Sequence, residues 1–234
     1  MHDHTYHSYQ QTNALLDIKP FSRLTSVMPI NSLLLPRQIH ASTGFLIDPT
    51  TMALIKPFAV PGDYIITDMP GMGIGVLTAD CLPIVLHDTI NHAIAIIHAG
   101  WRGSVAGIAI KALEHMNTVF GSIPRNIRVF FGPSAGHCCY SVGSEVIDAV
   151  IHCQDQVLIT RNNQTYFDLP GYNRILLQKA GIPASAFCSD YAECTICHQQ
   201  FWSYRRQKNL AGRQMTVVSL SRVQTKVLPK SLHT

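Results

Sequence analysis

A buried strand that runs directly into a helix constrains this chain more than any other feature of its sequence. Residues Ala93–His98 are apolar and rich in isoleucine, which is typical of a strand covered on both faces. A turn with two glycines, Gly100–Gly103, follows. Apolar side chains then recur at helical spacing over Ser104–Phe120, with Ser104 as the expected N-cap. The fold must therefore contain a sheet and a helix that are close together.

Other segments predict more strands and helices without a regular alternation of the two. Apolar runs with β-branched residues indicate strands, and amphipathic spacing indicates two further helices, the second with Asp168 as its N-cap. The expected strands are Asp63–Thr67, Gly73–Leu77, Ile84–His87, Ile127–Gly132 and Met215–Ser219, and the expected helices are Ser144–Ile151 and Leu169–Ala180. Because the two types mix irregularly, we expect an α+β fold with mixed sheets.

The chain is expected to form one domain. Its 234 residues exceed an average domain but fall short of two, and no low-complexity linker interrupts them. Residues 1–14 are polar and rich in histidine, and we expect them to be a frayed N-terminal tail. Only 14% of the residues are charged, which is typical of a compact protein whose surface is partly covered, for example by a partner subunit.

Charge and cysteine content exclude several classes of protein. The formal net charge of +4 is too small for the dense basic face of a typical nucleic-acid-binding protein. No apolar run approaches the ~18 residues that a membrane helix needs, and no secretory signal follows Met1. The seven cysteines, an odd number, are therefore expected to be reduced thiols in a cytoplasmic protein.

Reactive side chains occur beside turns in four separate segments. In the first three, His40 follows an apolar run, Cys81 follows Asp80 at a strand boundary, and His98 ends the buried strand. Each is a candidate metal ligand, although a hydrogen-bonded histidine or a buried cysteine fits the same patterns. Arg102, in the turn before the predicted helix, is a candidate for binding an anion.

The fourth segment contains Cys138 and Cys139 in a Gly-rich loop after a strand. Neighbouring side chains in extended backbone point to opposite sides, so at most one of these thiols is expected to face a given site. A Cys-x-x-Cys-His pattern near the C-terminus matches haem attachment, but that chemistry requires export. The alternative there is a small structural zinc site with the ligands Cys188, Cys194, Cys197 and His198.

Aromatic and guanidinium side chains are neighbours in Phe201–Arg206. Tyr204 or Trp202 is a candidate for stacking on a base, and Arg205 and Arg206 are candidates for pairing with phosphate. An amphipathic surface strand fits the same pattern.

Taken together and in this order, the segments resemble the polyphenol oxidase (laccase-domain) family. Its members include zinc-dependent purine nucleoside phosphorylases and proteins called peptidoglycan editing factors. The similarity extends over roughly residues 37–220. The matching pieces are Gln38-Ile39-His40, Asp63–Asp68, Ala79–Pro83, His98–Gly103, Gly132–Tyr140, Phe167–Leu169, Asn173-Arg174, Cys194-Thr195 and Ser203–Arg213.

The resemblance implies a single-domain layered α/β/β/α sandwich, with residues 15–234 as the catalytic domain. It also implies a zinc ion held by His40, Cys81 and His98, and three protein ligands leave one tetrahedral position open, as in catalytic zinc sites. The implied partners are a purine nucleoside and phosphate. Adenosine or inosine would be cleaved to the free base and ribose 1-phosphate, with adenosine deamination and methylthioadenosine cleavage as related activities.

For this chemistry the sequence offers several candidate residues. Asp80 is the carboxylate nearest to a ligand in the sequence and is the candidate proton shuttle. Arg102, Arg205 and Arg206 are candidates for holding phosphate, and Tyr204 is a candidate for binding the base.

The N-terminal segment departs from the family. Members usually carry Phe-Gly-Thr-Arg-x-Gly-Gly-x-Ser ahead of the Gln-x-His piece, whereas this chain reads Phe-Ser-Arg-Leu-Thr-Ser from Phe21. Arg23 and Ser26 are the candidates to replace the family's arginine and serine, which are thought to bind substrate and phosphate. Ala41 and His137 also stand where the family usually has glycine and proline.

Two other functions stay open at this stage. A copper-dependent polyphenol oxidase would also use a His-Cys-His set, but multicopper oxidation needs paired His-x-His motifs, and the only one here is His2–His4. The altered N-terminal segment also fits a weakly active factor that edits cell-wall precursors through an interaction.

Overall fold

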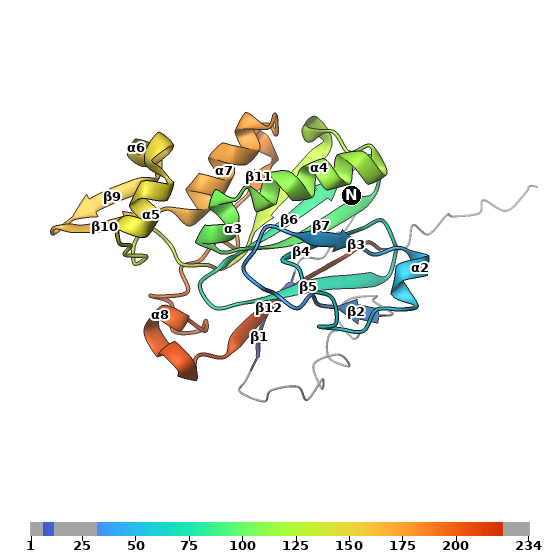
Figure 1. Ribbon diagram of the computed structural model, residues 1–234, viewed down its shortest axis with the longest axis horizontal. Helices are drawn as coiled ribbons and strands as arrows, with labels where there is room; N and C mark the ends of the chain where they lie inside the picture. The colour runs from blue at the N-terminus through green and yellow to red at the C-terminus, as the bar shows by residue number, and fades with distance from the viewer. Residues whose placement is uncertain (1–6, 12–31, 222–234) are drawn as a thin grey trace, which may run out of the picture.

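Two stacked β-sheets form the centre of the molecule, and helices cover the outer face of the larger sheet (Figure 1). The computed structural model describes residues 7–11 and 32–221. The larger sheet has the strand order β11-β8-β6-β7-β4-β3, with parallel pairs at both edges and antiparallel pairs between them. Its strands are β3 (Gly44–Leu46), β4 (Tyr64–Thr67), β6 (Leu82–Asp88), β7 (Ala93–Ala99), β8 (Ile127–Phe131) and β11 (Phe187–Cys188).

The smaller sheet has the order β1-β12-β5-β2, in which β12 is antiparallel to β1 and β5, and β2 is parallel to β5. The prediction of a frayed tail over residues 1–14 does not hold for residues 7–11, because they pair with the edge of β12; the rest of that segment lies outside the described residues. The strands are β1 (His7–Gln11), β2 (Ser32–Leu34), β5 (Met72–Thr78) and β12 (Arg213–Ser219).

Helices α3, α4 and α7 lie along the outer face of the larger sheet (Figure 1). Their bounds are Trp101–Val105, Ile108–Phe120 and Leu169–Lys179. The other elements are the helices α2 (Pro49–Met52), α5 (Ser144–Ala149), α6 (Gln154–Val157) and α8 (Tyr204–Gln207), the 3-10 turns η1 (Pro124–Asn126), η2 (Ile151–Cys153), η3 (Ala184–Ala186) and η4 (Lys208–Leu210), and the hairpin β9 (Leu158–Arg161) and β10 (Gln164–Phe167).

The predicted helix Ser104–Phe120 is in fact two helices, which corrects the expected N-cap. Helix α3 already begins at Trp101, and Gly107, with a φ of 76°, separates it from α4. Ser104 is buried inside α3, where its hydroxyl accepts a hydrogen bond from Asn173 Nδ2 at 2.9 Å. The cap predicted for α7 is confirmed, because the Asp168 side chain accepts from the Gly171 N–H at 3.0 Å.

Apolar side chains fill the spaces on both faces of the larger sheet. One cluster lies between that sheet and the helices, and a second lies between the two sheets. The expected α+β fold with mixed sheets in one domain is confirmed, as are the six predicted strands, whose ends differ from the predicted ones by at most two residues. Among the described elements, the layers are helices, larger sheet and smaller sheet, and the outer face of the smaller sheet packs against side chains such as Leu35 and Phe58.

The described helices are short. None of those within residues 7–11 and 32–221 has the length and apolar character to cross a membrane.

Candidate metal centre

Three side chains from distant parts of the chain meet at one end of the two sheets. His40 lies in the loop after β2, Cys81 in the turn between β5 and β6, and His98 near the end of β7. One ligand atom of each lies within 4.8 Å of the others. The two imidazole rings are nearly perpendicular, with centroids 4.8 Å apart. The structure thus brings together the three residues that the resemblance names as metal ligands.

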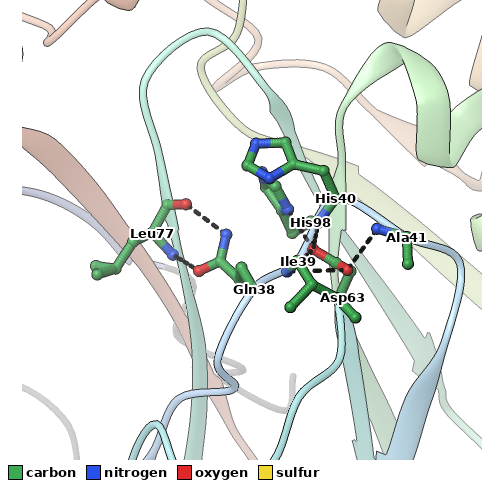
Figure 2. A network of polar contacts seen from close by, with 7 residues as sticks. All are labelled: Gln38, Ile39, His40, Ala41, Asp63, Leu77 and His98. Carbon is green, nitrogen blue, oxygen red and sulfur yellow. Dashed lines mark hydrogen bonds and ion pairs between the residues drawn. The ribbon is translucent and has the colours of Figure 1, made fainter. Parts of the chain in front are cut away.

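Asp63, which directly precedes β4, organises this site from below (Figure 2). Its buried carboxylate accepts hydrogen bonds from the backbone N–H groups of Ile39, His40 and Ala41, at 3.2, 3.0 and 2.8 Å. It also pairs with His98 Nδ1 at 2.8 Å. One carboxylate therefore fixes the loop that carries one imidazole and the ring orientation of the other, leaving Nε2 of His98 for a metal.

The loop around His40 needs this support because His40 has a φ of 57°. A left-handed backbone at a non-glycine residue costs about 1 kcal/mol, so it persists where neighbouring contacts over-determine it. Gln38 provides a second anchor, because its side-chain amide donates to the Leu77 carbonyl at 2.7 Å and accepts from the Leu77 N–H at 2.8 Å (Figure 2). The side chain of Gln38 thus pairs with the end of β5 as a strand residue would.

Gly100, the N-cap of α3, and Gly103, inside that helix, allow close approach to the candidate metal ligands and their loop. A Cβ atom at Gly100 would lie 3.1 Å from Cys81 Sγ and 3.7 Å from His40 Cδ2. A Cβ at Gly103 would lie 2.9 Å from the carbonyl oxygen of Ala41. These two glycines therefore make room for Cys81 and for the loop that carries His40.

Electrostatics favours the ionised form of Cys81. Burial opposes ionisation, but the nearby imidazoles of His98 and His40 lower the pKa of the thiol to about 6. For His98, burial is outweighed by Cys81 and Asp63, which raise the pKa of the imidazole to about 9. The thiolate is the form that binds metals, so the pocket prepares this ligand before an ion arrives.

Alkylation of metal-free protein tests this. Because the pKa of Cys81 is lowered, its thiolate is present above about pH 6 and is lost as the pH falls through that value. We expect iodoacetamide to label Cys81 at pH 7, with half the maximal rate near pH 6, and zinc to block the labelling. Peptide mass spectrometry measures the extent of labelling at each cysteine. Buried Cys153, whose pKa is raised, is the internal control. Labelling of Cys81 that begins only above pH 8 would contradict the electrostatic argument.

Asp80, the predicted proton shuttle, lies beside Cys81 and joins several loops. Its Oδ1 accepts from Thr195 Oγ1 at 2.7 Å, and its Oδ2 accepts from the Arg205 N–H at 2.6 Å. Its carbonyl accepts from the Ala135 N–H at 2.8 Å. The carboxylate lines the cavity, as a shuttle must, and it also holds the segments around residues 135, 195 and 205 next to the metal ligands.

A cavity of about 670 Å³ opens over the three ligands. That volume lies within the usual range for sites of small molecules. Asp80 is the one carboxylate among its lining residues, whereas four arginines line it, so the cavity favours an anion. The arginines are Arg37, Arg102, Arg205 and Arg213, and the aromatic lining residues are Phe58, Trp101, Tyr140 and Tyr204.

The residues predicted to bind substrate do not all reach this cavity. Arg102 lines it and pairs with Glu145 at 2.7 Å on the surface. Tyr204 and Arg205 also line it, and the Arg205 guanidinium lies 4.8 Å from the Tyr140 ring centroid. Arg206 does not line it, because its guanidinium donates to the backbone carbonyls of Thr195, Ile196 and Phe201. Trp202 packs against Gly212 and is likewise outside the lining.

Several residues of the site were not singled out from the sequence. Asp63 could have been found from its position, because a carboxylate directly before an apolar strand is expected to be buried. A buried carboxylate needs hydrogen-bond partners nearby. Tyr140 followed the two cysteines of a matching piece, whereas Arg37 and Arg213 carried no signal beyond their charge. Arg23 and Ser26, which were proposed as replacements for substrate-binding residues, lie outside the described residues.

The cysteines near the C-terminus form a different group from the predicted one. Cys194 and Cys197 gather with Cys138 and Cys139, and the four sulfur atoms lie within 4.8 Å of one another. The expectation that only one of the adjacent cysteines would face a site is wrong, because residues 137–139 form a turn rather than extended backbone. Cys188 and His198, members of the predicted zinc set, pair instead with Asp190 and Glu193.

Comparison with known proteins identifies the family of this chain. The relative named adenosine deaminase RL5, from an unknown prokaryotic organism, is 36% identical over 209 residues, which are 83% of this chain and 79% of that protein. A purine nucleoside phosphorylase of Deinococcus radiodurans is 34% identical over 165 residues, 69% of this chain and 62% of that protein. The crystal structure of YlmD from Geobacillus stearothermophilus superposes with a TM-score of 0.77 at 27% identity, over 87% of this chain and 78% of that one. A family model described as multi-copper polyphenol oxidoreductase laccase matches residues 18–221, and the chain therefore belongs to that family.

Proposed function

We propose that this protein is a zinc-dependent purine nucleoside phosphorylase that cleaves adenosine and inosine to the free base and ribose 1-phosphate. The observation that carries the proposal is a set of two imidazoles and one thiolate at an arginine-lined cavity. The relatives named purine nucleoside phosphorylase support the same class of substrate. Methylthioadenosine is a further candidate substrate, because it has the same base and glycosidic bond.

The donor set fits zinc. Zinc is bound by thiolate and imidazole ligands, and catalytic sites use three protein ligands with the fourth position open. The Asp63–His98 pair supplies the carboxylate that commonly orients a metal-binding imidazole. When bound by His40, Cys81 and His98, the ion supplies Lewis acidity at the cavity floor.

The side chains of this protein would hold the two substrates. Phosphate needs cationic partners, and Arg37, Arg102, Arg205 and Arg213 line the cavity. Aromatic side chains of the lining, Tyr204 above all, offer faces for the purine. Asp80 would move a proton in this reaction, and its two hydrogen bonds from Thr195 and Arg205 hold the carboxylate in one orientation.

Adenosine deamination is the second candidate activity, and the relative of that name at 36% identity favours it. A multicopper oxidase fits less well. Within residues 7–11 and 32–221, His40 and His98 are the only imidazoles in the two groups of candidate metal ligands, and the other group consists of thiols. Multicopper oxidation needs about ten histidines.

One incubation separates these functions. Metal-quantified protein is mixed with adenosine, with or without phosphate, and the products are identified by chromatography. We expect adenine and ribose 1-phosphate only when phosphate is present. Inosine in both mixtures would establish deamination instead. If neither product forms at full zinc occupancy, the proposed enzymatic function is wrong.

Substitution of Arg37 tests the anion site. Within the described residues, its guanidinium makes no hydrogen bond or ion pair, so it is free to bind phosphate. A charge-assisted hydrogen bond contributes about 1.5–3 kcal/mol, and Arg37→Met is therefore expected to raise the KM for phosphate at least about tenfold. The KM for adenosine is expected to change little. Arg125→Met, at an exposed position outside the cavity, is the matched control. Equal phosphate KM values in both variants would remove Arg37 from the site.

A further inference from the structure

Two segments of this chain place four thiols side by side, outside the cavity of the proposed enzyme. Cys138 and Cys139 come from the loop after β8, and Cys194 and Cys197 come from the loop after β11. All four are free thiols. Their sulfur atoms lie within 4.8 Å of one another, and those of Cys138 and Cys197 are 3.8 Å apart.

We propose that Cys138, Cys139, Cys194 and Cys197 form a second, structural metal site that binds one zinc ion through four thiolates. Four sulfur atoms at about 2.3 Å from zinc in a tetrahedron are about 3.8 Å from each other. The separation between Cys138 and Cys197 matches this value. A closed set of four protein ligands leaves no position for substrate, so the site is structural, unlike the His40–Cys81–His98 centre.

The backbone around the thiols is shaped for this purpose. The turn at residues 137–139 is closed by hydrogen bonds from Cys139 and Tyr140 to the Gly136 carbonyl, both at 2.9 Å, and it directs two adjacent side chains to one place. The Gly136 N–H donates to Cys194 Sγ at 3.4 Å. A Cβ at Gly136 would lie 3.1 Å from Cys194 Cβ, so glycine is needed for the two loops to approach.

Two arginines balance the charge of such a site. Four thiolates around Zn²⁺ carry a net charge of −2. The Arg161 guanidinium donates to the carbonyls of His137 and Cys138, at 3.2 and 2.7 Å. The Arg206 guanidinium donates to those of Thr195 and Ile196, both at 2.7 Å. Each ligand segment thus has its own cation, and this explains the position of Arg206 outside the cavity.

The proposed site would also brace the metal centre used for catalysis. Cys194 is followed by Thr195, whose N–H donates to the Ser134 carbonyl at 2.9 Å and whose hydroxyl donates to Asp80. Zinc between the two loops would therefore hold Asp80 next to Cys81. Metal binding contributes directly to the folding free energy of such sites.

Metal counting on the full chain tests the proposal. Protein expressed in medium supplemented with zinc is expected to contain two zinc ions per chain, as measured by elemental mass spectrometry. Cys81→Ser is expected to retain one, and the double variant Cys138→Ser/Cys197→Ser is expected to retain one. Cys188→Ser, the control that belongs to the rival ligand set, is expected to keep two. One ion per chain in the parent and none in Cys81→Ser would overturn the proposal.

A spectroscopic measurement on the Cys81→Ser protein tests the proposal even if the double variant does not fold. The Cys81→Ser protein loaded with Co²⁺ is expected to show the intense sulfur-to-cobalt charge-transfer bands of a four-thiolate site, and their absence would overturn the proposal. Thiol titration of the unfolded, metal-free chain checks for the competing disulfide. All seven thiols are expected, whereas five would mean that two of these cysteines are oxidised to each other.

Discussion

Replacing His98 with alanine is expected to empty the proposed metal centre and to reduce the proposed turnover of adenosine about a thousand-fold or more. His98 is 2% exposed, and it is held between Cys81 and Asp63, so no other side chain can take its place without rearrangement of β7. A catalytic metal supplies several kcal/mol of transition-state stabilisation, which corresponds to a loss of this size. Steady-state kinetics together with metal content measure the effect.

His152→Ala is the matched control for this prediction. His152 is an exposed imidazole outside the cavity, with its ring next to Tyr172. The His152→Ala variant should retain the full metal content and the full turnover of the parent protein. A His98→Ala enzyme that turned over adenosine at the parent rate would refute the assigned role of His98, whatever its metal content.

Replacing Asp63 with asparagine is expected to destabilise the fold by about 3 kcal/mol and to weaken zinc binding 10- to 100-fold. The Asp63 carboxylate accepts hydrogen bonds from three backbone N–H groups and pairs with His98, whereas an amide would present N–H donors to some of these partners. Without the charge, the left-handed turn at His40 and the ring of His98 lose their common anchor. Urea unfolding and competition with a chelator measure the two effects.

Asp88→Asn separates the two effects. Asp88 is equally buried, at 0% exposure, and it accepts hydrogen bonds from the Ile90 and Asn91 backbone in the turn after β6. It is far along β6 from Cys81, at the opposite end of the strand. We expect comparable destabilisation with unchanged zinc affinity. If the zinc affinity of Asp63→Asn also stayed unchanged, Asp63 would be a folding residue only.

The residues that sequence patterns located correctly are those whose environment is local. Alternating or continuous apolar runs predicted β4 to β8 and β12, because the pattern of apolar residues that marks a buried strand lies within the strand itself. The cap of α7 at Asp168 was predicted for the same reason, since its partner is three residues away. The break at Gly107 was missed because the apolar stripe continues through it, and only the left-handed backbone divides the helix.

The candidate metal ligands could be named only through the resemblance to a family. His40, Cys81 and His98 are separated by 41 and 17 residues in the sequence, so no spacing rule links them. The structure brings them together because β6 and β7 are antiparallel neighbours, so that Cys81, just before β6, lies near His98 at the end of β7. Asp63 bonds to both His98 and the backbone of His40 and so holds the third residue at the same place.

The sequence by itself determined the class of elements, the single α+β domain and the chemical types available: imidazole, thiolate and guanidinium. Tertiary structure decided which of them act together. The Arg206 guanidinium binds backbone carbonyls rather than lining the cavity. The four thiols of Cys138, Cys139, Cys194 and Cys197 lie together, although the sequence patterns had placed the first two and the last two in separate candidate sites. The physical reason is that metal-ligand and buried polar contacts form across the chain, where sheet pairing and loop packing, rather than neighbouring residues, set the distances.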